Sequence, residues 1–367
     1  MDKENSSALN KESVIEVPEI NKDSFEVEKP LTKIDILKKL SSGTALRESL
    51  NDIVNGGMGA LIVISNSNCY NVFKGGFYVN CKFTPKRLTE LAKMDGAIIL
   101  SDDFKKILYA NTLLVPDSSL SSNETGTRHQ AGERTAKQIN GMVIAVSERK
   151  GTITIYYGNS RYVLQNTQEL LRRTTETLQI LEKQKEVFNE LIANLNVLEV
   201  TNLVSIADVC TILERLEMIR KMSNIINEYI LELGKEGIIV RMRMRELTKG
   251  IEEKEDVIIK DYLNRPVRVR QFFDGLSFEG LLDLENIAEF LFGKSLETGV
   301  VTKGYRILGK TRLDKNEIES LIKHFKNLDN ILNADLESLG KFLNSDAQTL
   351  QNELSTIREH IMVGKKI

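Results

Sequence analysis

Cysteine and histidine are scarce in this sequence of 367 residues, which contains only three of each. Cys69, Cys81 and Cys210 form no close pair and show no metal-ligand spacing, which argues against a disulfide framework or a zinc site. We expect free thiols in a reducing cytoplasm. The N-terminal stretch has no apolar core of signal-peptide length, and no stretch approaches the roughly 18 apolar residues of a membrane span. We therefore predict a cytoplasmic protein without a membrane segment.

The sequence also has no large excess of positive or of negative charge. The net charge is −2, so binding to nucleic acid would require a local basic patch. The sequence contains no HExxH, no GxSxG and no histidine–cysteine cluster, which excludes the common zinc-protease and serine-hydrolase motifs. Its 41% hydrophobic and 28% charged residues are typical of a soluble globular protein. The length predicts two or three domains.

A glycine-rich stretch, GGMGALIV, contains Gly56, Gly57 and Gly59. It is not a phosphate loop of the common NTPase kind, because no Gly-Lys-Ser/Thr follows it. It also precedes an apolar run that predicts a strand, whereas the dinucleotide-binding fingerprint follows one. We interpret these glycines as a turn into the first core strand.

Residues 31–165 predict a mixed α/β domain, preceded by an acidic, flexible tail over residues 1–30. The runs GALIVIS, GAIILS and GMVIAVS are bounded by Gly, Ser and Asn, as buried strands are. TITIYYG and RYVL predict two more strands after the turn SERKG. TPKRLTELAKM and AGERTAKQI predict helices.

From residue 166 onward the sequence predicts helices, with a spine over 166–300 and short helices over 301–367. A helix face near heptad spacing could pack in a bundle or support oligomerisation. This apolar face consists of Leu171, Leu178, Leu181, Phe188, Ile192 and Leu195.

A basic stripe at Arg241, Arg243 and Arg245 could contact phosphate or be a solvated helix face.

Asp95 and Gly96 lie between a predicted helix, LTELAKM, and a predicted strand, AIIL. At such a junction the carboxylate can point into a cleft, while glycine lets a ligand approach the backbone. An ordinary Asp–Gly turn is the alternative. Asp102 and Asp103 are expected to cap a helix that begins at FKKILYA.

A second polar motif, Gly126-Thr127-Arg128-His129, directly precedes the helical run AGERTAKQ. The arginine fork, the imidazole and the amide groups of a helix start together form an anion cradle. A solvated polar loop is the alternative. Ser147, at the end of GMVIAVS, could reach the same site.

Glu133 and Arg134, in the run AGERTAKQ, are expected to pair with neighbours across the helix surface. His324 and His360 are expected to be surface or packing residues. A single carboxylate together with an Arg/His cradle suits metal-assisted phosphoryl transfer, in which the acid holds Mg²⁺ or Mn²⁺ and the basic groups hold phosphate.

DGAIIL, LYANTLLVPDSS and ETGTRH followed by AGERTAKQ resemble the catalytic domain of diadenylate cyclases. The layout is similar to that of the bacterial DNA integrity scanning proteins, over roughly residues 31–340. The resemblance implies an α/β cyclase domain with a mixed central sheet flanked by helices. An all-α spine and a small all-α helix-hairpin-helix-like domain would follow it.

The same resemblance implies that two ATP molecules condense into cyclic di-AMP with release of two pyrophosphates. Each 3′-hydroxyl attacks the α-phosphate of the ATP in a facing domain, which implies a homo-oligomer such as an octamer. Asp95 would hold Mg²⁺ or Mn²⁺ and would be catalytic together with Arg128 and His129. Leu114 would pack on the adenine. The implied ATP site consists of Gly96, Ala97, Leu114, Gly126, Thr127, Arg128, His129, Gln130, Ala131 and Ser147.

The sequence departs from the family pattern at three places. Gln130 stands where the family usually has the second arginine of Arg-His-Arg, and Ala131 stands where threonine is common. The stretch GKFLNSDAQTLQ, at 340–351, lacks the Gly-x-Gly hairpin that approaches a DNA phosphate. A nucleotide-sensing or DNA-binding scaffold with a weakened cyclase site is therefore the alternative function. A purely structural helical oligomer would leave the DGA and GTRH motifs unexplained.

Overall fold

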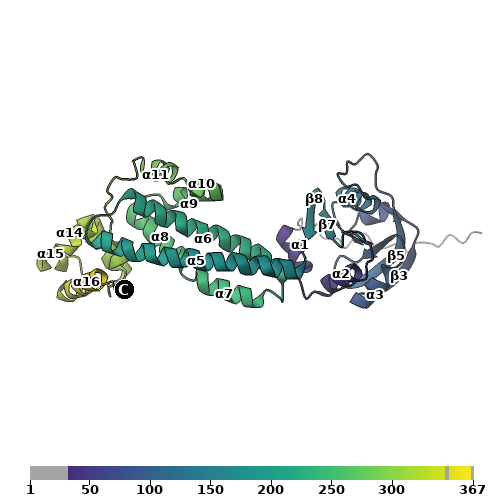
Figure 1. The fold of residues 1–367 in the computed structure, drawn as a ribbon, viewed down its shortest axis with the longest axis horizontal. Helices are drawn as coiled ribbons and strands as arrows, with labels where there is room; N and C mark the ends of the chain where they lie inside the picture. Colours follow the sequence, from purple (N-terminus) through teal and green to yellow (C-terminus); the bar gives the residue numbers. More distant parts are fainter. Residues whose placement is uncertain (1–31, 344–346, 365–367) are drawn as a thin grey trace, which may run out of the picture. The chain divides into compact units, whose positions relative to one another are not determined.

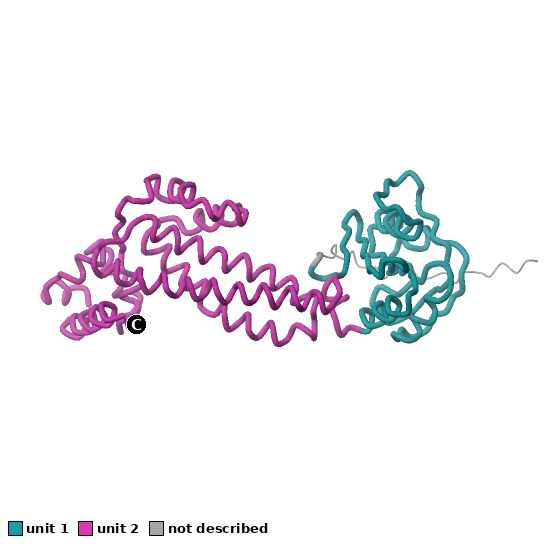
Figure 2. Tube along the Cα trace, viewed as in Figure 1, with its two compact units in different colours: residues 1–36, 45–164 teal, residues 37–44, 165–367 magenta. Residues whose placement is uncertain are grey.

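The computed structural model describes residues 32–343 and 347–364, which divide into two compact units (Figure 2). The first unit contains residues 45–164 and the described residues before Leu37. The second contains residues 37–44 and the chain from Gln165 onward. The predicted acidic tail at 1–30 lies outside the described residues. Within the described residues, no helix is long and apolar enough to span a membrane.

The first unit is built on one mixed sheet. The strands run in the order β2-β5-β4-β1-β6-β7-β8, and β3 also pairs with β5. Among the described strands, β1 pairs parallel with β4, and the other pairings are antiparallel. The strands are β1 (Ala60–Ile64), β2 (Phe73–Lys74), β3 (Phe77–Lys82), β4 (Ala97–Leu100), β5 (Lys106–Leu114), β6 (Met142–Val146), β7 (Ile153–Tyr157) and β8 (Ser160–Leu164).

Helices cover both faces of this sheet. Figure 1 shows α4 (Thr127–Ile139) on one side and α2 (Ala45–Asn55) with α3 (Pro85–Leu91) on the other. Every residue of β1 and β6 is buried, because these central strands have helices above and below. The apolar runs GALIVIS, GAIILS and GMVIAVS therefore form core strands, and the predicted mixed α/β fold is confirmed.

The expected helix at FKKILYA is wrong, because residues 106–110 of this stretch belong to β5 and the two before them lie in a turn. Residues 106–114 pair antiparallel with β4, and this pairing outweighs the local helical pattern. Asp103 forms a turn instead of a helix cap. Its Oδ1 accepts hydrogen bonds from Ser101 Oγ at 2.6 Å and from the Lys105 amide at 3.0 Å, and Phe104 has a φ of 58°.

The second unit is helical, as predicted. The helix α1 (Lys33–Lys39) crosses the division between the units. The position of a boundary near residue 300 stays a prediction. The remaining helices are α5 (Thr167–Val200), α6 (Ile206–Leu233), α7 (Ile238–Thr248), α8 (Ile251–Tyr262), α9 (Pro266–Gly275), α10 (Phe278–Leu281), α11 (Leu284–Phe292), α12 (Tyr305–Leu308), α13 (Lys315–Phe325), α14 (Leu328–Leu332), α15 (Leu336–Gly340) and α16 (Ala347–Met362).

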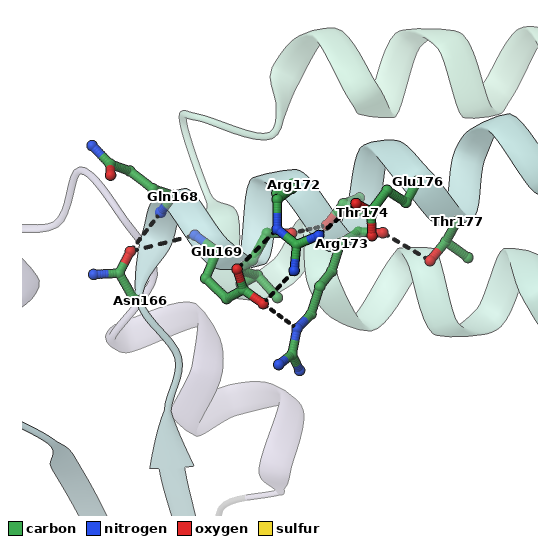
Figure 3. Close-up of polar contacts among 9 residues, drawn as sticks. Asn166, Gln168, Glu169, Arg172, Arg173, Thr174, Glu176 and Thr177 are labelled. Atoms are coloured by element: carbon green, nitrogen blue, oxygen red, sulfur yellow. Dashed lines mark hydrogen bonds and ion pairs between the residues drawn. The ribbon is translucent and has the colours of Figure 1, made fainter.

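The longest helix, α5, begins with a side-chain cap. Asn166 Oδ1 accepts hydrogen bonds from the amides of Gln168 and Glu169 (Figure 3), which satisfies two of the unpaired donors at the helix start. Glu169 then pairs with Arg172 and Arg173 on the exposed surface. With 34 residues, α5 extends over about 51 Å at about 1.5 Å per residue.

Two apolar cores stabilise the second unit. The larger packs α5 and α6 with helices α7 to α11. The predicted heptad face of α5 enters it, with Leu178, Leu181, Phe188 and Leu195 buried. The smaller core joins helices α12 to α16 with Val200 at the end of α5.

A buried polar joint attaches α12 to the ends of α5 and α8. Asp261 accepts hydrogen bonds from the amides of Gly304, Tyr305 and Arg306 at 2.9, 2.6 and 3.0 Å. Arg306 also pairs with Glu199 near the end of α5. Since each of these charges is paired or hydrogen-bonded, the joint tolerates burial.

We predict that Phe188→Ala lowers the free energy of unfolding by about 3–5 kcal/mol, because the ring is fully buried and its loss leaves a cavity. Ile180→Ala, on the same helix, is the control. Its side chain is 53% exposed, so its cost should stay below about 0.5 kcal/mol. Urea unfolding followed by circular dichroism measures both. Equal losses for the two variants would contradict the packing described for α5.

Candidate active site

The motif GTRH forms the start of α4. Gly126 is the N-cap residue, with φ −91° and ψ 136°, and it supplies no side-chain cap. The first turn contains no acidic residue. Thr127 is exposed, while Arg128 and His129 are half-buried. Since no residue of the first turn carries a carboxylate, the positive end of the helix favours an anion there.

Arg128 lies directly against the backbone of Gly59, just before β1. A β-carbon at position 59 would lie 1.9 Å from Nη1 and 2.5 Å from Cζ of Arg128. Only glycine leaves room for the guanidinium in this position. The sequence interpretation of a turn fits Gly57, whose φ is 63°, but it missed this role of Gly59. No sequence signal connects two positions so far apart in the chain.

The register of the sheet brings the predicted residues to one edge. Since β1 and β4 are parallel, with Ile62 opposite Ile98, they begin at the same edge, and Asp95 lies two residues before β4. Since β6 is antiparallel to β1, with Ala60 opposite Val146, Ser147 follows β6 at that edge. Asp95 is exposed. The edge therefore collects a carboxylate, a hydroxyl and the guanidinium of Arg128.

The packing of the sheet requires glycine at position 96. Its φ is 90°, and a β-carbon there would lie 2.8 Å from the Thr112 carbonyl oxygen. Glycine is thus needed for the close packing of β4 on β5 as well as for any approach by a ligand. Thr112 Oγ1 donates to the carbonyl of the buried Ala97 at 2.9 Å.

Leu114 ends β5 at the same edge, because Thr112 stands opposite Ala97 at the start of β4. It is half-buried, and it packs with Ala131 of α4 against the core of the first unit. The neighbouring Leu113 is 67% exposed. Because successive side chains of a strand point to opposite faces of the sheet, only Leu114 lies on the α4 side, where it offers an apolar contact for a flat ligand.

His129 is held between α4 and β7. Its ring meets the edge of Tyr156, with centroids 6.5 Å apart and planes at 82°. Burial lowers the pKa of the imidazole, and the carboxylate of Glu124 opposes this effect. The pKa is lowered further by the neighbouring cations Arg128, Arg161 and Lys150.

A polar stripe on α4 holds the preceding segment, residues 120–124. The stripe consists of residues 130, 133, 134 and 137, which share one helix face. Glu133 pairs with Lys137 as expected, but Arg134 does not follow the expected surface pairing. Its Nε donates to a backbone carbonyl instead. The bonds to the segment are Gln130 Nε2 to Glu124 O (2.7 Å), Ser122 Oγ to Glu133 Oε2 (2.6 Å), Arg134 Nε to Leu120 O (2.9 Å) and Lys137 Nζ to Ser121 O (2.8 Å).

Among the described residues, no group of three or more His, Cys, Asp or Glu side chains is arranged to hold a metal ion. A divalent cation at this edge would thus rely on Asp95 together with oxygens from substrate phosphate and water. Mg²⁺ is commonly bound in this way, through one or two carboxylates plus phosphate. The exposed carboxylate of Asp95 at this edge is compatible with that arrangement.

Two family models match the chain. The nucleotide-binding domain of the DisA bacterial checkpoint controller matches residues 47–161, and the linker region of the same controller matches residues 164–298. Two curated relatives are named DNA integrity scanning protein DisA. The one from Clostridium botulinum (strain Alaska E43 / Type E3) is 42% identical over 354 residues, which cover 94% of this chain and 100% of the relative. The one from Clostridioides difficile (strain 630) is 40% identical over 312 residues, which cover 83% of this chain and 88% of the relative.

These matches extend over both units of the structure, and the nucleotide-binding match contains the sheet edge with Asp95 and the start of α4. The chain belongs to the DisA family of DNA integrity scanning proteins, a family of diadenylate cyclases.

Proposed function

We propose that this chain condenses two ATP molecules into cyclic di-AMP and releases two pyrophosphates. Each 3′-hydroxyl attacks the α-phosphate of the facing ATP, the new phosphodiester bond forms, and the bond to pyrophosphate breaks. The observation that supports the proposal best is the collection of Asp95, Arg128 and the open start of α4 at one sheet edge. Carboxylate, guanidinium and helix amides are the groups that phosphoryl transfer needs.

Each group has a distinct role in this proposal. The amides at the start of α4, with Thr127 and Arg128, hold phosphate oxygens and neutralise the charge that develops on them. His129 hydrogen-bonds a phosphate oxygen, and its imidazolium form, which the lowered pKa disfavours, binds phosphate most tightly. Asp95 orients the 3′-hydroxyl and would hold Mg²⁺ or Mn²⁺, which when bound supplies further positive charge at the α-phosphate. Ser147 contacts the same phosphates, and Leu114 packs on the adenine.

The reaction requires two facing sites, because one domain aligns only one nucleophile with one leaving group. We therefore propose a homo-oligomer, an octamer in the cytoplasm, with cyclase domains paired at this edge. Exposed apolar side chains beside the site support the pairing. Leu113, Val115 and Phe77 are 67%, 43% and 58% exposed on β5, directly after it and on β3. Such side chains favour burial against a second domain.

We predict that Asp95→Asn abolishes cyclic di-AMP formation, with a loss of at least about 100-fold, because the carboxylate orients both the 3′-hydroxyl and the cation. Asp102→Asn is the matched control. Asp102 is also exposed, and its Oδ1 accepts a bond from the Asp103 amide, which an asparagine oxygen can still accept. Its activity should stay unchanged. Chromatography of nucleotides after incubation with ATP and either Mg²⁺ or Mn²⁺ measures the product.

No product from the unmodified protein with either metal would favour the alternative, a nucleotide-sensing or DNA-binding scaffold. The hydrogen bond made by the Gln130 side chain argues against a scaffold with a weakened cyclase site. This side chain anchors the segment before α4 through Glu124 O, so the missing arginine leaves an ordered helix start in place.

We predict that Gly59→Ala weakens ATP binding about 10- to 100-fold, because the new methyl group displaces the Arg128 guanidinium and removes its charge-assisted bonds to phosphate. Gly56→Ala is the control, since its methyl group would meet mainly the flexible end of the Met58 side chain. Isothermal titration with ATP measures both affinities. Unchanged affinity in Gly59→Ala would show that Arg128 does not bind the nucleotide from this position.

We propose only weak binding of branched DNA by the C-terminal helices. Side chains in GKFLNSDAQTLQ stand where glycines would allow the backbone to approach a phosphate. Part of this stretch, residues 344–346, lies outside the described residues. Gel shifts with a Holliday junction between 50 and 200 mM salt should give weak affinity at every salt concentration. Tight binding that falls about 1,000-fold over this range would contradict the proposal.

A further inference from the structure

Glu124 occupies a central position in the segment that enters α4. Its Oε1 accepts hydrogen bonds from Tyr156 Oη at 2.8 Å and from Arg161 Nε at 2.6 Å. Tyr156 and Arg161 stand opposite each other in the pairing of β7 with β8, so their side chains leave the sheet on the same face. The carboxylate therefore ties the segment to the β7–β8 hairpin.

The Glu124 carboxylate is largely buried, with 18% of the side chain exposed. Burial acts to raise its pKa, but the hydrogen bonds from Arg161 and Tyr156 outweigh burial and lower it. Glu124 is thus ionised at neutral pH. Burial and this neighbouring negative charge raise the pKa of Tyr156, so its phenol remains protonated and continues to donate.

The main chain of Glu124 is fixed as well. Its carbonyl oxygen accepts a bond from Gln130 Nε2 at 2.7 Å, which closes a loop around the first turn of α4. Tyr156, the side-chain partner of Glu124, also borders the ring of His129. Glu124 therefore fixes the backbone before the N-cap residue, and it also fixes the ring of Tyr156, against which the His129 imidazole packs.

We propose that Glu124 is a positioning residue for the phosphate-binding start of α4. This inference rests on the proposed function of that site. Glu124 itself touches no phosphate in the proposal. Its two side-chain bonds set the position of Thr127 and His129, and its negative charge stabilises the imidazolium form of His129.

The expected pH effect follows from the groups that face His129. Burial, Arg128, Arg161 and Lys150 lower the pKa of the imidazole, whereas Glu124 raises it, and the ring of Tyr156 is a neutral neighbour. Glu124→Gln removes the raising charge, so the pKa of His129 falls. The imidazolium is then lost at a lower pH, and the decline of kcat/KM on the alkaline side moves to lower pH.

The experiment compares Glu124→Gln with Glu133→Gln. Both residues are largely buried carboxylates that hold the segment before α4. Glu133, however, bonds to Ser122, Asn123 and Lys137, whereas Glu124 bonds to Tyr156, which borders His129. We expect Glu124→Gln to raise the KM for ATP about tenfold. In this variant the pH at which kcat/KM declines on the alkaline side should fall by about one unit, because an adjacent charge shifts a pKa by about that much or more. Glu133→Gln should keep both values, even if its thermal stability falls.

The affinity for 3′-deoxy-ATP, which cannot cyclise, gives a second measurement that does not depend on turnover. Glu124→Gln should weaken it about tenfold at pH 7.5, since a tenfold change corresponds to one pKa unit. If the unmodified protein makes no cyclic di-AMP, the proposed function fails, and this affinity still decides the role of Glu124. Unchanged affinity and pH profile in a folded Glu124→Gln would overturn the inference. Equal effects of Glu133→Gln would also overturn it, because they would indicate a merely structural role.

Discussion

The guanidinium of Arg128 lies against the backbone of Gly59, and this contact joins the first turn of α4 to the start of β1. The rest of the candidate site depends on it. The parallel pairing of β1 with β4 places Asp95 at the same edge, and the antiparallel pairing with β6 places Ser147 there. A side chain at position 59 would displace the Arg128 guanidinium from this place. Gly59 thus sets where the guanidinium lies at the sheet edge that also carries Asp95.

The helix start is held from several directions. The polar stripe of α4 fixes residues 120–124, and Glu124 connects the same segment to the β7–β8 hairpin. Such preorganisation matters for phosphoryl transfer, because the protein acts mainly by positioning and by electrostatic stabilisation. Gln130 belongs to this scaffold. The departure from Arg-His-Arg therefore changes a charge but keeps an anchor at the helix start.

Much of this fold could be predicted from the sequence, and the exceptions have physical reasons. Apolar runs such as GALIVIS identified the central strands, because both faces of those strands are covered. The helix was predicted only from Ala131 onward, whereas α4 begins at Thr127, so the residues predicted to precede the helix form its first turn. FKKILYA was assigned wrongly, since pairing with β4 determines its conformation. The contacts of Gly59 and Glu124 join residues far apart in the chain, and a single sequence contains no signal for such pairs.

In the helical unit, too, the sequence predicted one feature and missed another. The apolar face of α5 was visible in its spacing, whereas the buried joint of Asp261 with the start of α12 was not. Charged residues at helix ends are usually solvated, and only the fold shows that this one is enclosed and paired.

The central claim is that ATP phosphates bind at the start of α4, beside Gly59 and Asp95. A crystal structure with 3′-deoxy-ATP and Mn²⁺ tests it most directly, because the nucleotide cannot react and manganese is identified by its anomalous scattering. We expect phosphate oxygens on Arg128 and on the amides of the first turn, with manganese bound by Asp95. Nucleotide bound elsewhere, or manganese away from Asp95, would contradict it.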